Sequence, residues 1–270
     1  MLGHFYEQFT DTLIQLGIGR GDIVYVSSDL KKLLFLLTAE YGITASDRRN
    51  EVLNRLVQCI QQVTGKEGTI LFPVFSWSFC RKEGFDYVHT KGETGTFSNW
   101  VMQNRKDFVR TRHPMYSFMV WGKDAELLKA MDNQDAWGIC SPFHYLHENH
   151  AKQVLFDIEA YQGLTFGHYV EQAVKVPYRY SKYFSGRYVD EKGRAEVRMY
   201  SMYVRKAGVD VSCGVRNEFL IHHGAAVQKE WQKSMITVAD LAACFPLLWD
   251  DMANQNGRNT LVFRNHDDRL

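Results

Sequence analysis

The pattern that most constrains the fold is a short apolar run, then an amphipathic segment, then a second short apolar run. Ile23-Val-Tyr-Val26 and Thr69-Ile-Leu-Phe72 are typical of strands buried in a parallel sheet. Between them, residues 47–63 place apolar side chains at helical spacing and end near Gly65. This order is that of a right-handed parallel crossover, so we predict an α/β fold.

Further segments before and after this crossover extend the pattern. Apolar spacing predicts helices at residues 5–16, 124–131 and 143–148, and strands at residues 115–121 and 154–156. Residues 76–98 combine Gly, Lys, Glu, Thr and aromatic residues without a clear period. Because long irregular stretches in compact proteins are usually functional, we predict an active-site loop there.

The character of the chain changes beyond Pro177. Residues 183–189 and 195–204 read as the strands of a hairpin whose tip is Lys192-Gly193. The remaining predicted elements are a segment at 218–224, a helix near 238–253, a strand at 260–263 and a polar tail at 264–270. We find no repeat and no linker. The sequence thus predicts one α/β/α domain over residues 1–270, with a mixed, largely parallel sheet and an antiparallel C-terminal extension.

Composition limits the classes of partner. Lys and Arg number 32 against 31 Asp and Glu, which gives no overall electrostatic reason to expect nucleic acid or an acidic membrane. The five cysteines are widely spaced and form no C-x-x-C pair, a pattern that favours reduced thiols in a cytosol. The N-terminal residues do not resemble a secretory signal, and no apolar run reaches membrane-spanning length. We therefore expect a cytoplasmic protein without nucleic-acid or membrane partners.

A histidine and a glutamate stand three residues apart in Thr165-Phe-Gly-His168-Tyr-Val-Glu171. With Thr165 as N-cap of a helix, His168 and Glu171 share one face, and the carboxylate reaches one imidazole nitrogen. Because the segment follows an apolar run, the pair is expected in the crevice beyond a strand end. It reads as a general-base dyad. The alternative is a solvated surface pair, which is the more common role of a histidine and a glutamate at this spacing.

Two other polar clusters are less specific. Ser27-Ser28-Asp29 follows the first predicted strand. This pattern is typical either of a phosphate-binding loop or of residues that cap the next helix. His144, His147 and His150 have metal-like spacing, but no carboxylate or thiol set accompanies them, so we predict surface histidines and no metal.

Five short motifs, in order, resemble the aminoglycoside 3-N-acetyltransferase family, the antibiotic acetyltransferases outside the GNAT fold. They resemble the family patterns G-D-x-x-x-V-H-x-S-L, G-T-(apolar)-P, H-P-x-x-S, G-x-x-S-P and T-x-x-H-x-x-E. The matching stretches are Gly21 to Leu30, Gly68 to Pro73, His113 to Ser117, Gly138 to Pro142, and Thr165 to Glu171.

The resemblance implies transfer of an acetyl group from acetyl-coenzyme A to a sugar amine, without a metal. It makes His168 and Glu171 the catalytic pair, which suits the chemistry because an ammonium with a pKa of roughly 10 must lose a proton before it attacks a thioester. It places the coenzyme at the end of the first strand, and we add Ser117 as a contributor to stabilising the oxyanion. The expected coenzyme-binding residues are Ser27, Ser28, Asp29, Leu30 and Ser117.

Two departures from the family pattern bear on the substrates. Asp29 would repel a phosphate, so the loop at 27–30 is expected to bind the coenzyme differently or to contact only its pantetheine arm. Residues 178–198 are basic and aromatic, which favours an anionic acceptor. We therefore predict an amino sugar linked to a nucleotide diphosphate, as used in surface polysaccharide synthesis.

Three alternatives stay open. The first is an aminoglycoside 3-N-acetyltransferase that confers antibiotic resistance. The second is a hydrolase with a Ser or Cys nucleophile, although the chain has no G-x-S-x-G elbow. The third is a non-catalytic binding protein that kept the fold. A homodimer is a possible assembly, although the sequence does not determine the oligomeric state.

Overall fold

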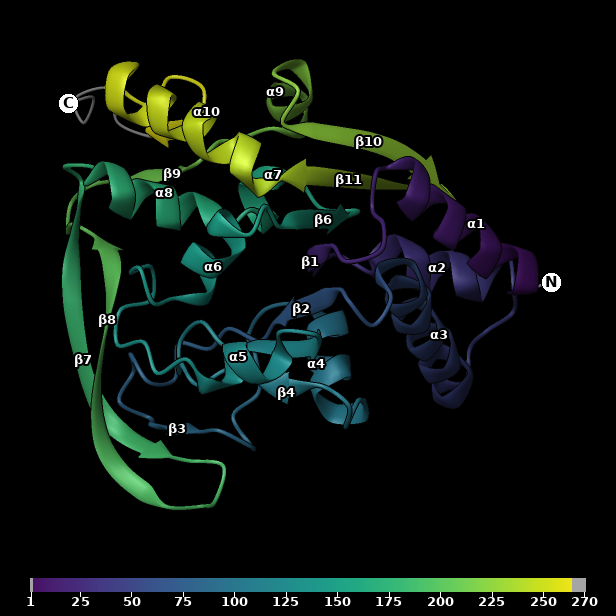
Figure 1. Ribbon diagram of the computed structural model, residues 1–270, viewed down its shortest axis with the longest axis horizontal. Coiled ribbons are helices and arrows are strands. Elements are labelled where there is room, and N and C mark those ends of the chain that lie inside the picture. Colours follow the sequence, from purple (N-terminus) through teal and green to yellow (C-terminus); the bar gives the residue numbers. More distant parts are fainter. Residues whose placement is uncertain (1, 264–270) are drawn as a thin grey trace.

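The computed structural model describes residues 2–263, so the predicted polar tail at 264–270 lies outside the described residues. Its centre is a seven-stranded mixed sheet in the order β10-β11-β6-β1-β2-β5-β4 (Figure 1). The strands are β1 (Ile23–Ser28), β2 (Thr69–Pro73), β4 (Val109–Arg110), β5 (Phe118–Gly122), β6 (Lys152–Phe156), β10 (Ala226–Trp231) and β11 (Ser234–Asp240). The predicted α/β fold with a mixed sheet is confirmed. The expectation that the sheet is largely parallel is wrong, because four of its six strand pairings are antiparallel.

Parallel pairing is confined to the three central strands. Strand β1 pairs parallel with β2 on one side and with β6 on the other, which is the predicted crossover geometry. The four outer strands join antiparallel. The centre of β1 is buried on both faces, in agreement with its continuous apolar sequence.

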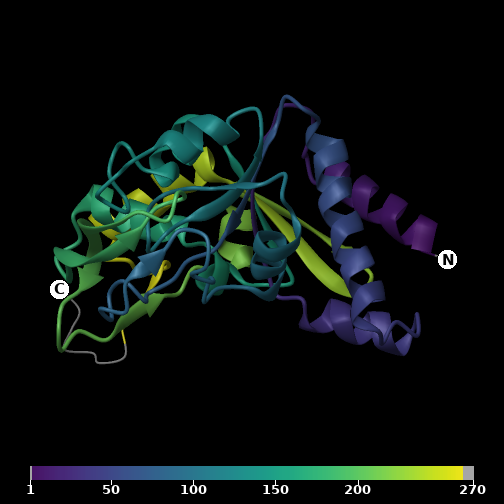
Figure 2. The ribbon, with the colours of Figure 1, turned by 90° about the horizontal axis from the view of Figure 1, so that it is seen from below.

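Alternate side chains of β1 enter two different cores. Val24 and Val26 pack beneath the N-terminal helices, whereas Tyr25 points into the core of the opposite face. The first face is covered by α1 (Leu2–Gln15), α2 (Lys31–Ala39), α3 (Ser46–Thr64) and α4 (Thr96–Asn104). The second is covered by α5 (Ala125–Ala130), α6 (Pro142–Glu148), α7 (Ala160–Gly163), α8 (Phe166–Val174) and α10 (Leu241–Asn254). Figure 2 shows the purple and blue helices apart from the teal and yellow ones.

The predicted hairpin is present and is longer than expected. Strands β7 (Arg179–Val189) and β8 (Ala195–Arg205) pair along their whole length, and β3 (Phe85–Asp86) joins β7. In Figure 1 this hairpin curves along the left edge of the molecule. Strands β9 (Val211–Cys213) and β12 (Leu261–Phe263) form a small separate sheet, and α9 (Asn217–His222) precedes β10.

The last helix starts later than the sequence predicts. The expected helix near 238–253 begins only at Leu241, because residues 234–240 form β11 in the sheet. The Asp240 side chain accepts hydrogen bonds from the backbone N–H groups of Ala242 and Ala243 and so caps α10. The hairpin β10–β11 was not predicted. Its turn is Gln232-Lys233, both with positive φ, and these residue types are not a turn signature.

Candidate active site

Helix α8 carries the predicted pair and is anchored by apolar contacts. Phe166, Tyr169 and Val170 are buried in the core, which turns the opposite side of the helix outward. Thr165 occupies the predicted N-cap position, but its side chain makes no capping hydrogen bond. Lys175 ends the helix in a left-handed conformation.

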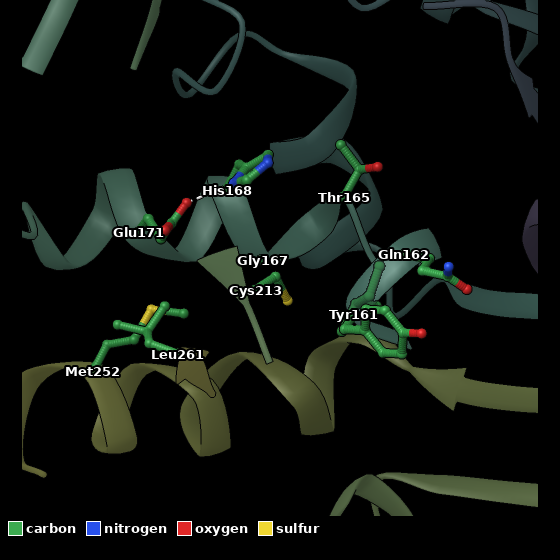
Figure 3. A pocket seen from close by; sticks show the side chains of 10 residues that line it. Tyr161, Gln162, Thr165, Gly167, His168, Glu171, Cys213, Met252 and Leu261 are labelled. Carbon is green, nitrogen blue, oxygen red and sulfur yellow. Dashed lines mark hydrogen bonds and ion pairs between the residues drawn. The ribbon is translucent and has the colours of Figure 1, made fainter. Parts of the chain in front are cut away.

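The two side chains meet as their spacing predicts (Figure 3). His168 Nδ1 lies 2.5 Å from Glu171 Oε2. The His168 side chain is 34% exposed, whereas that of Glu171 is only 5% exposed. The imidazole therefore reaches solvent while its carboxylate partner is sealed in the protein.

Tyr178, just before β7, and Arg179, the first residue of β7, hold Glu171 from the other side. The Tyr178 hydroxyl donates a hydrogen bond of 2.8 Å to Oε1. The Arg179 Nε forms an ion pair of 2.8 Å with Oε2. Burial by itself raises the pKa of the Glu171 carboxyl, but His168, Arg179 and Tyr178 outweigh burial and hold that pKa below its usual range. Glu171 is accordingly an ionised, buried carboxylate.

The charge of Glu171 settles which imidazole nitrogen carries the proton. An ionised carboxylate only accepts hydrogen bonds, so the Nδ1 of His168 must be the donor in the 2.5 Å contact. Arg179 Nη2 lies farther from Nδ1, at 3.3 Å. In the neutral imidazole, Nε2 then keeps its lone pair and is able to accept a proton.

A small cavity of about 60 Å³ borders α8 on the side of α10. It has room for a few water molecules. Figure 3 shows Met252 and Leu261 at one side of it and the dyad at the other. Its wall consists of Tyr161, Gln162, Leu164, Thr165, Gly167, His168, Glu171, Cys213, Met252 and Leu261.

A second cavity, of about 70 Å³, lies where β1 and β2 end. Gln162 and Thr165 line both cavities, so the two spaces adjoin at the turn between α7 and α8. The wall of the second one is hydroxyl-rich and contains no charged side chain: Tyr25, Ser27, Ser28, Pro73, Phe75, Thr94, Gly95, Ser98, Ile158, Gln162, Gly163 and Thr165.

The four residues predicted to bind the coenzyme at the end of the first strand lie in different surroundings. Ser27 and Ser28 line the second cavity. Asp29 instead accepts from the backbone N–H of Lys31 and pairs with its ammonium at 3.3 Å, and Leu30 is buried in the apolar core. Only the two serines among these four residues are therefore placed at a cavity.

Ser117 belongs to a buried network at another strand. Its hydroxyl donates to the carbonyl of Val74 and accepts from Arg110 Nε, at 3.1 and 3.0 Å. Arg110 also donates to the carbonyls of Tyr87 and Thr90, and burial lowers the pKa of its guanidinium to about 10. The predicted active-site loop is tied down by this arginine, and Ser117 lines neither cavity described above.

The hydroxyl-rich cavity allows a test of the coenzyme expectation. The Tyr25 hydroxyl is fully buried at its wall, near the hydroxyls of Ser27 and Thr165 but, within residues 2–263, without a hydrogen bond of good geometry. An unpaired buried hydroxyl and several further hydroxyls fit a narrow, neutral arm with amide groups, such as pantetheine. Since no Lys or Arg lines this cavity, its wall offers no cationic ligand for phosphates.

The basic hairpin is less basic than its sequence indicates. Arg179 pairs with Glu171, Arg194 with Asp190 at 2.7 Å, and Arg198 with both Glu196 and Asp132 at 2.5 and 3.3 Å. Lys182 lies over the ring of Phe184, and neither it nor Arg187 has an ion-pair partner in the described part of the chain. The contacts of Tyr178 and Arg179 with Glu171 were not predicted from the sequence, in which both residues count only as part of a basic, aromatic segment.

The other histidine cluster is held by a tyrosine. His144 Nδ1 and His147 Nδ1 lie 3.0 and 3.2 Å from the hydroxyl of Tyr169. Within residues 2–263 no group of three or more His, Cys, Asp or Glu side chains is arranged to hold a metal ion. Over the same residues, no helix has the length and apolar character needed to cross a membrane.

Comparisons with known proteins point to one family. The model of the aminoglycoside 3-N-acetyltransferase family matches residues 45–244. No curated protein sequence matches that of this chain.

Solved structures of similar fold include the YokD protein from Bacillus subtilis, which is 18% identical with a TM-score of 0.71 over 94% of this chain and 95% of its own. AAC-IIIb, in a binary complex with CoASH, is 17% identical with a TM-score of 0.70 over 93% and 96%. AAC-VIa, bound to sisomicin, is 16% identical with a TM-score of 0.71 over 93% and 97%. At these identities the likeness concerns the fold.

Proposed function

Because the chain belongs to the aminoglycoside 3-N-acetyltransferase family, we propose that it transfers an acetyl group from acetyl-coenzyme A to an amine of an amino sugar. The observation that carries the proposal is the contact between His168 and the buried, ionised Glu171. A histidine held by a carboxylate at a cavity is suited to remove the proton of an attacking amine.

The protein's own groups have distinct tasks in this reaction. Nε2 of His168 takes the proton from the acceptor amine, and Glu171 stabilises the imidazolium that results. Tyr178 and Arg179 keep the carboxylate of Glu171 ionised and fixed. The imidazole of His168 is therefore already oriented before the reaction begins. Their contribution is therefore to position the base.

Acetyl-coenzyme A would supply the activated acetyl thioester. Support for it comes from the CoASH complex of AAC-IIIb, which has a similar fold, and from the hydroxyl-rich cavity beside Thr165. We assign the pantetheine arm to this cavity, with Ser27, Ser28 and the unpaired Tyr25 hydroxyl as hydrogen-bonding groups. Asp29 is not assigned to the coenzyme, because Lys31 already pairs with it.

For the acceptor we propose a polycationic amine of the aminoglycoside type. The preference for a nucleotide-linked amino sugar was based on a basic wall at residues 178–198, and it is not supported: three of the arginines there have carboxylate partners. The family and the sisomicin complex of AAC-VIa favour the aminoglycoside alternative.

Release of the coenzyme A thiol tests the proposal. The enzyme is incubated with acetyl-coenzyme A and either sisomicin or UDP-glucosamine, with an acceptor-free control that reports hydrolysis. We expect thiol release with sisomicin that exceeds the control. Turnover only with UDP-glucosamine would favour the hypothesis of a nucleotide-linked acceptor. Equal thiol release with and without an amine would favour a hydrolase.

A further inference from the structure

The cavity beside the dyad has two chemically different ends. Gln162, Thr165 and the dyad itself form its polar end. On the side away from the dyad, the wall consists of the apolar side chains of Met252 and Leu261 (Figure 3). Met252 belongs to α10 and Leu261 to β12. The apolar wall is therefore supplied by C-terminal elements, and the polar one by α7 and α8.

The remaining wall residues do not make the apolar end more polar. Burial raises the pKa of the Cys213 thiol to about 11, so this thiol is neutral at pH 7 and behaves as a small apolar group. Both oxygens of Glu171 already have partners within the protein, namely the residues that hold it as described above. The cavity thus joins a reactive polar end to a neutral apolar one.

The size of the cavity excludes most candidate occupants. Its volume of about 60 Å³ has room for a few groups as large as a water molecule, and a methylene group is of that size. A sugar ring with its hydroxyl groups is too large, whereas a short alkyl chain fits. The acceptor does not need this space, because the His168 side chain is 34% exposed and can be approached from solvent.

The thioester of the donor is expected where the two cavities adjoin. With the pantetheine arm in the hydroxyl-rich cavity, the thioester reaches Gln162 and Thr165, which line both spaces. Its acyl chain then points into the cavity beside the dyad. We propose that this cavity is an acyl pocket, and that the enzyme transfers short-chain acyl groups up to butyryl in addition to acetyl. The inference rests on the proposed function and specifies its donor.

The chemistry is the same for each acyl group. The amine nitrogen bonds to the carbonyl carbon, and the C–S bond breaks. The proton of the amine passes to Nε2 of His168 and then to the departing thiolate, so the products are an amide and the coenzyme A thiol. Because the alkyl chain takes no part in these steps, its length acts through binding. Each methylene moved from water to the apolar wall should strengthen binding about fourfold.

Thiol release with acetyl-, propionyl-, butyryl- and hexanoyl-coenzyme A, with sisomicin as acceptor, tests the acyl pocket. For the wild type we expect the KM of the donor to fall about fourfold per methylene from acetyl to butyryl. With hexanoyl-coenzyme A, kcat/KM should be at least about tenfold lower than with the butyryl donor, because the longer chain overfills the cavity. A KM for butyryl-coenzyme A that equals or exceeds that for acetyl-coenzyme A would overturn the pocket.

Two substitutions of Leu261 change the room at the apolar end in opposite directions. Leu261→Phe should abolish the preference for butyryl over acetyl, and Leu261→Ala should extend the range of donors to hexanoyl. Val262→Ala is the matched control, because Val262 is on the same strand, is exposed and does not line this cavity. It should keep the wild-type preference. A preference for butyryl that persists in Leu261→Phe would contradict the assignment.

Failure of the proposed function is recognised separately. If no donor releases thiol, calorimetric titration of acetyl- and butyryl-coenzyme A into the wild type and Leu261→Phe still tests the pocket. Binding of the butyryl donor that is at least about tenfold tighter in the wild type, but not in the variant, supports the pocket without the reaction. Equal affinities, or no binding, overturn it. Thermal unfolding verifies that each variant is folded, and the wild-type series decides alone if one is not.

Discussion

Two helices of this protein carry a histidine followed three residues later by a glutamate. On α1, His4 Nδ1 lies 3.7 Å from Glu7 Oε2, and both side chains are 76% exposed. On α8, His168 and Glu171 lie 2.5 Å apart with the carboxylate buried. Figure 1 places the two helices at opposite ends of the molecule.

The difference between the pairs lies in what surrounds them. His4 has Gln8 as a further partner on its own helix, and solvent screens the pair. Glu171 is held by Tyr178 and Arg179, which come from the hairpin, and its histidine borders a cavity. Identical spacing thus yields an exposed pair on one helix and, on the other, a pair whose carboxylate is buried and held by two further residues. Tertiary packing decides which of the two forms.

The largest expected effect separates the two histidines. His168→Ala should lower kcat by about 1,000-fold, since general-base catalysis contributes on the order of 10²- to 10⁴-fold. His4→Ala should leave kcat unchanged. Thiol release under saturating acetyl-coenzyme A measures both, and a His168→Ala enzyme with more than a tenth of wild-type activity would remove His168 from the role of base.

The two glutamates should differ in stability. Glu171→Gln leaves the guanidinium of Arg179 buried without its counter-ion, and we expect the free energy of unfolding to fall by about 3 kcal/mol. Glu7→Gln should not change it measurably. Urea unfolding measures the difference, and the double variant Glu171→Gln, Arg179→Met should regain part of the loss if the unpaired charge is its cause.

Lowering the pH should abolish the difference in the free energy of unfolding between wild type and Glu171→Gln. The folded-state pKa of Glu171 is held below its usual range, so its contribution is complete above about pH 4.3, the pKa of Glu in an unfolded chain. The contribution is lost as pH falls from there through the lower folded-state pKa. Urea midpoints between pH 7 and pH 3 should therefore converge for the two proteins only below about pH 4.3. A gap that stays constant to pH 3 would mean that the charge of Glu171 does not stabilise the fold.

The smallest expected effect concerns the tyrosine behind the dyad. Tyr178→Phe removes one hydrogen bond to Glu171 and should cost about 1–2 kcal/mol of stability together with a several-fold loss of kcat. Tyr203→Phe is a matched control, because that hydroxyl donates to the carbonyl of Val176 and not to the dyad. A similar stability loss with full kcat is expected for the control. If both variants lose kcat equally, Tyr178 acts only on stability.

Local patterns predicted most of the elements that position the site. The hairpin tip at Lys192-Gly193 was recognisable because glycine readily adopts the positive φ that such turns need, and Gly193 has this conformation in the structure. Asp190 also accepts hydrogen bonds from the backbone N–H groups of Lys192 and Arg194. The turn at Gln232-Lys233 was not, because neither residue type favours the left-handed conformation it adopts there.

The roles of charged residues were harder to predict than their positions. Arg179 was interpreted as part of a basic wall, yet it neutralises Glu171, and Ser117 was assigned to the oxyanion, yet it bonds to the buried Arg110. In both cases the structure adds a partner of the side chain, which composition and spacing do not specify.

The amino-acid sequence by itself determined the α/β pattern, the parallel centre of the sheet, the long hairpin and the contact between His168 and Glu171. All of these follow from periodicities of a few residues, because helix and strand geometry relate near neighbours in the chain. Only the tertiary structure decided that Glu171 is buried and paired with Arg179, and that three arginines at residues 178–198 have carboxylate partners. The physical reason is that the ionisation and burial of a side chain depend on every group within a few ångströms, and those groups come from segments that the fold brings together.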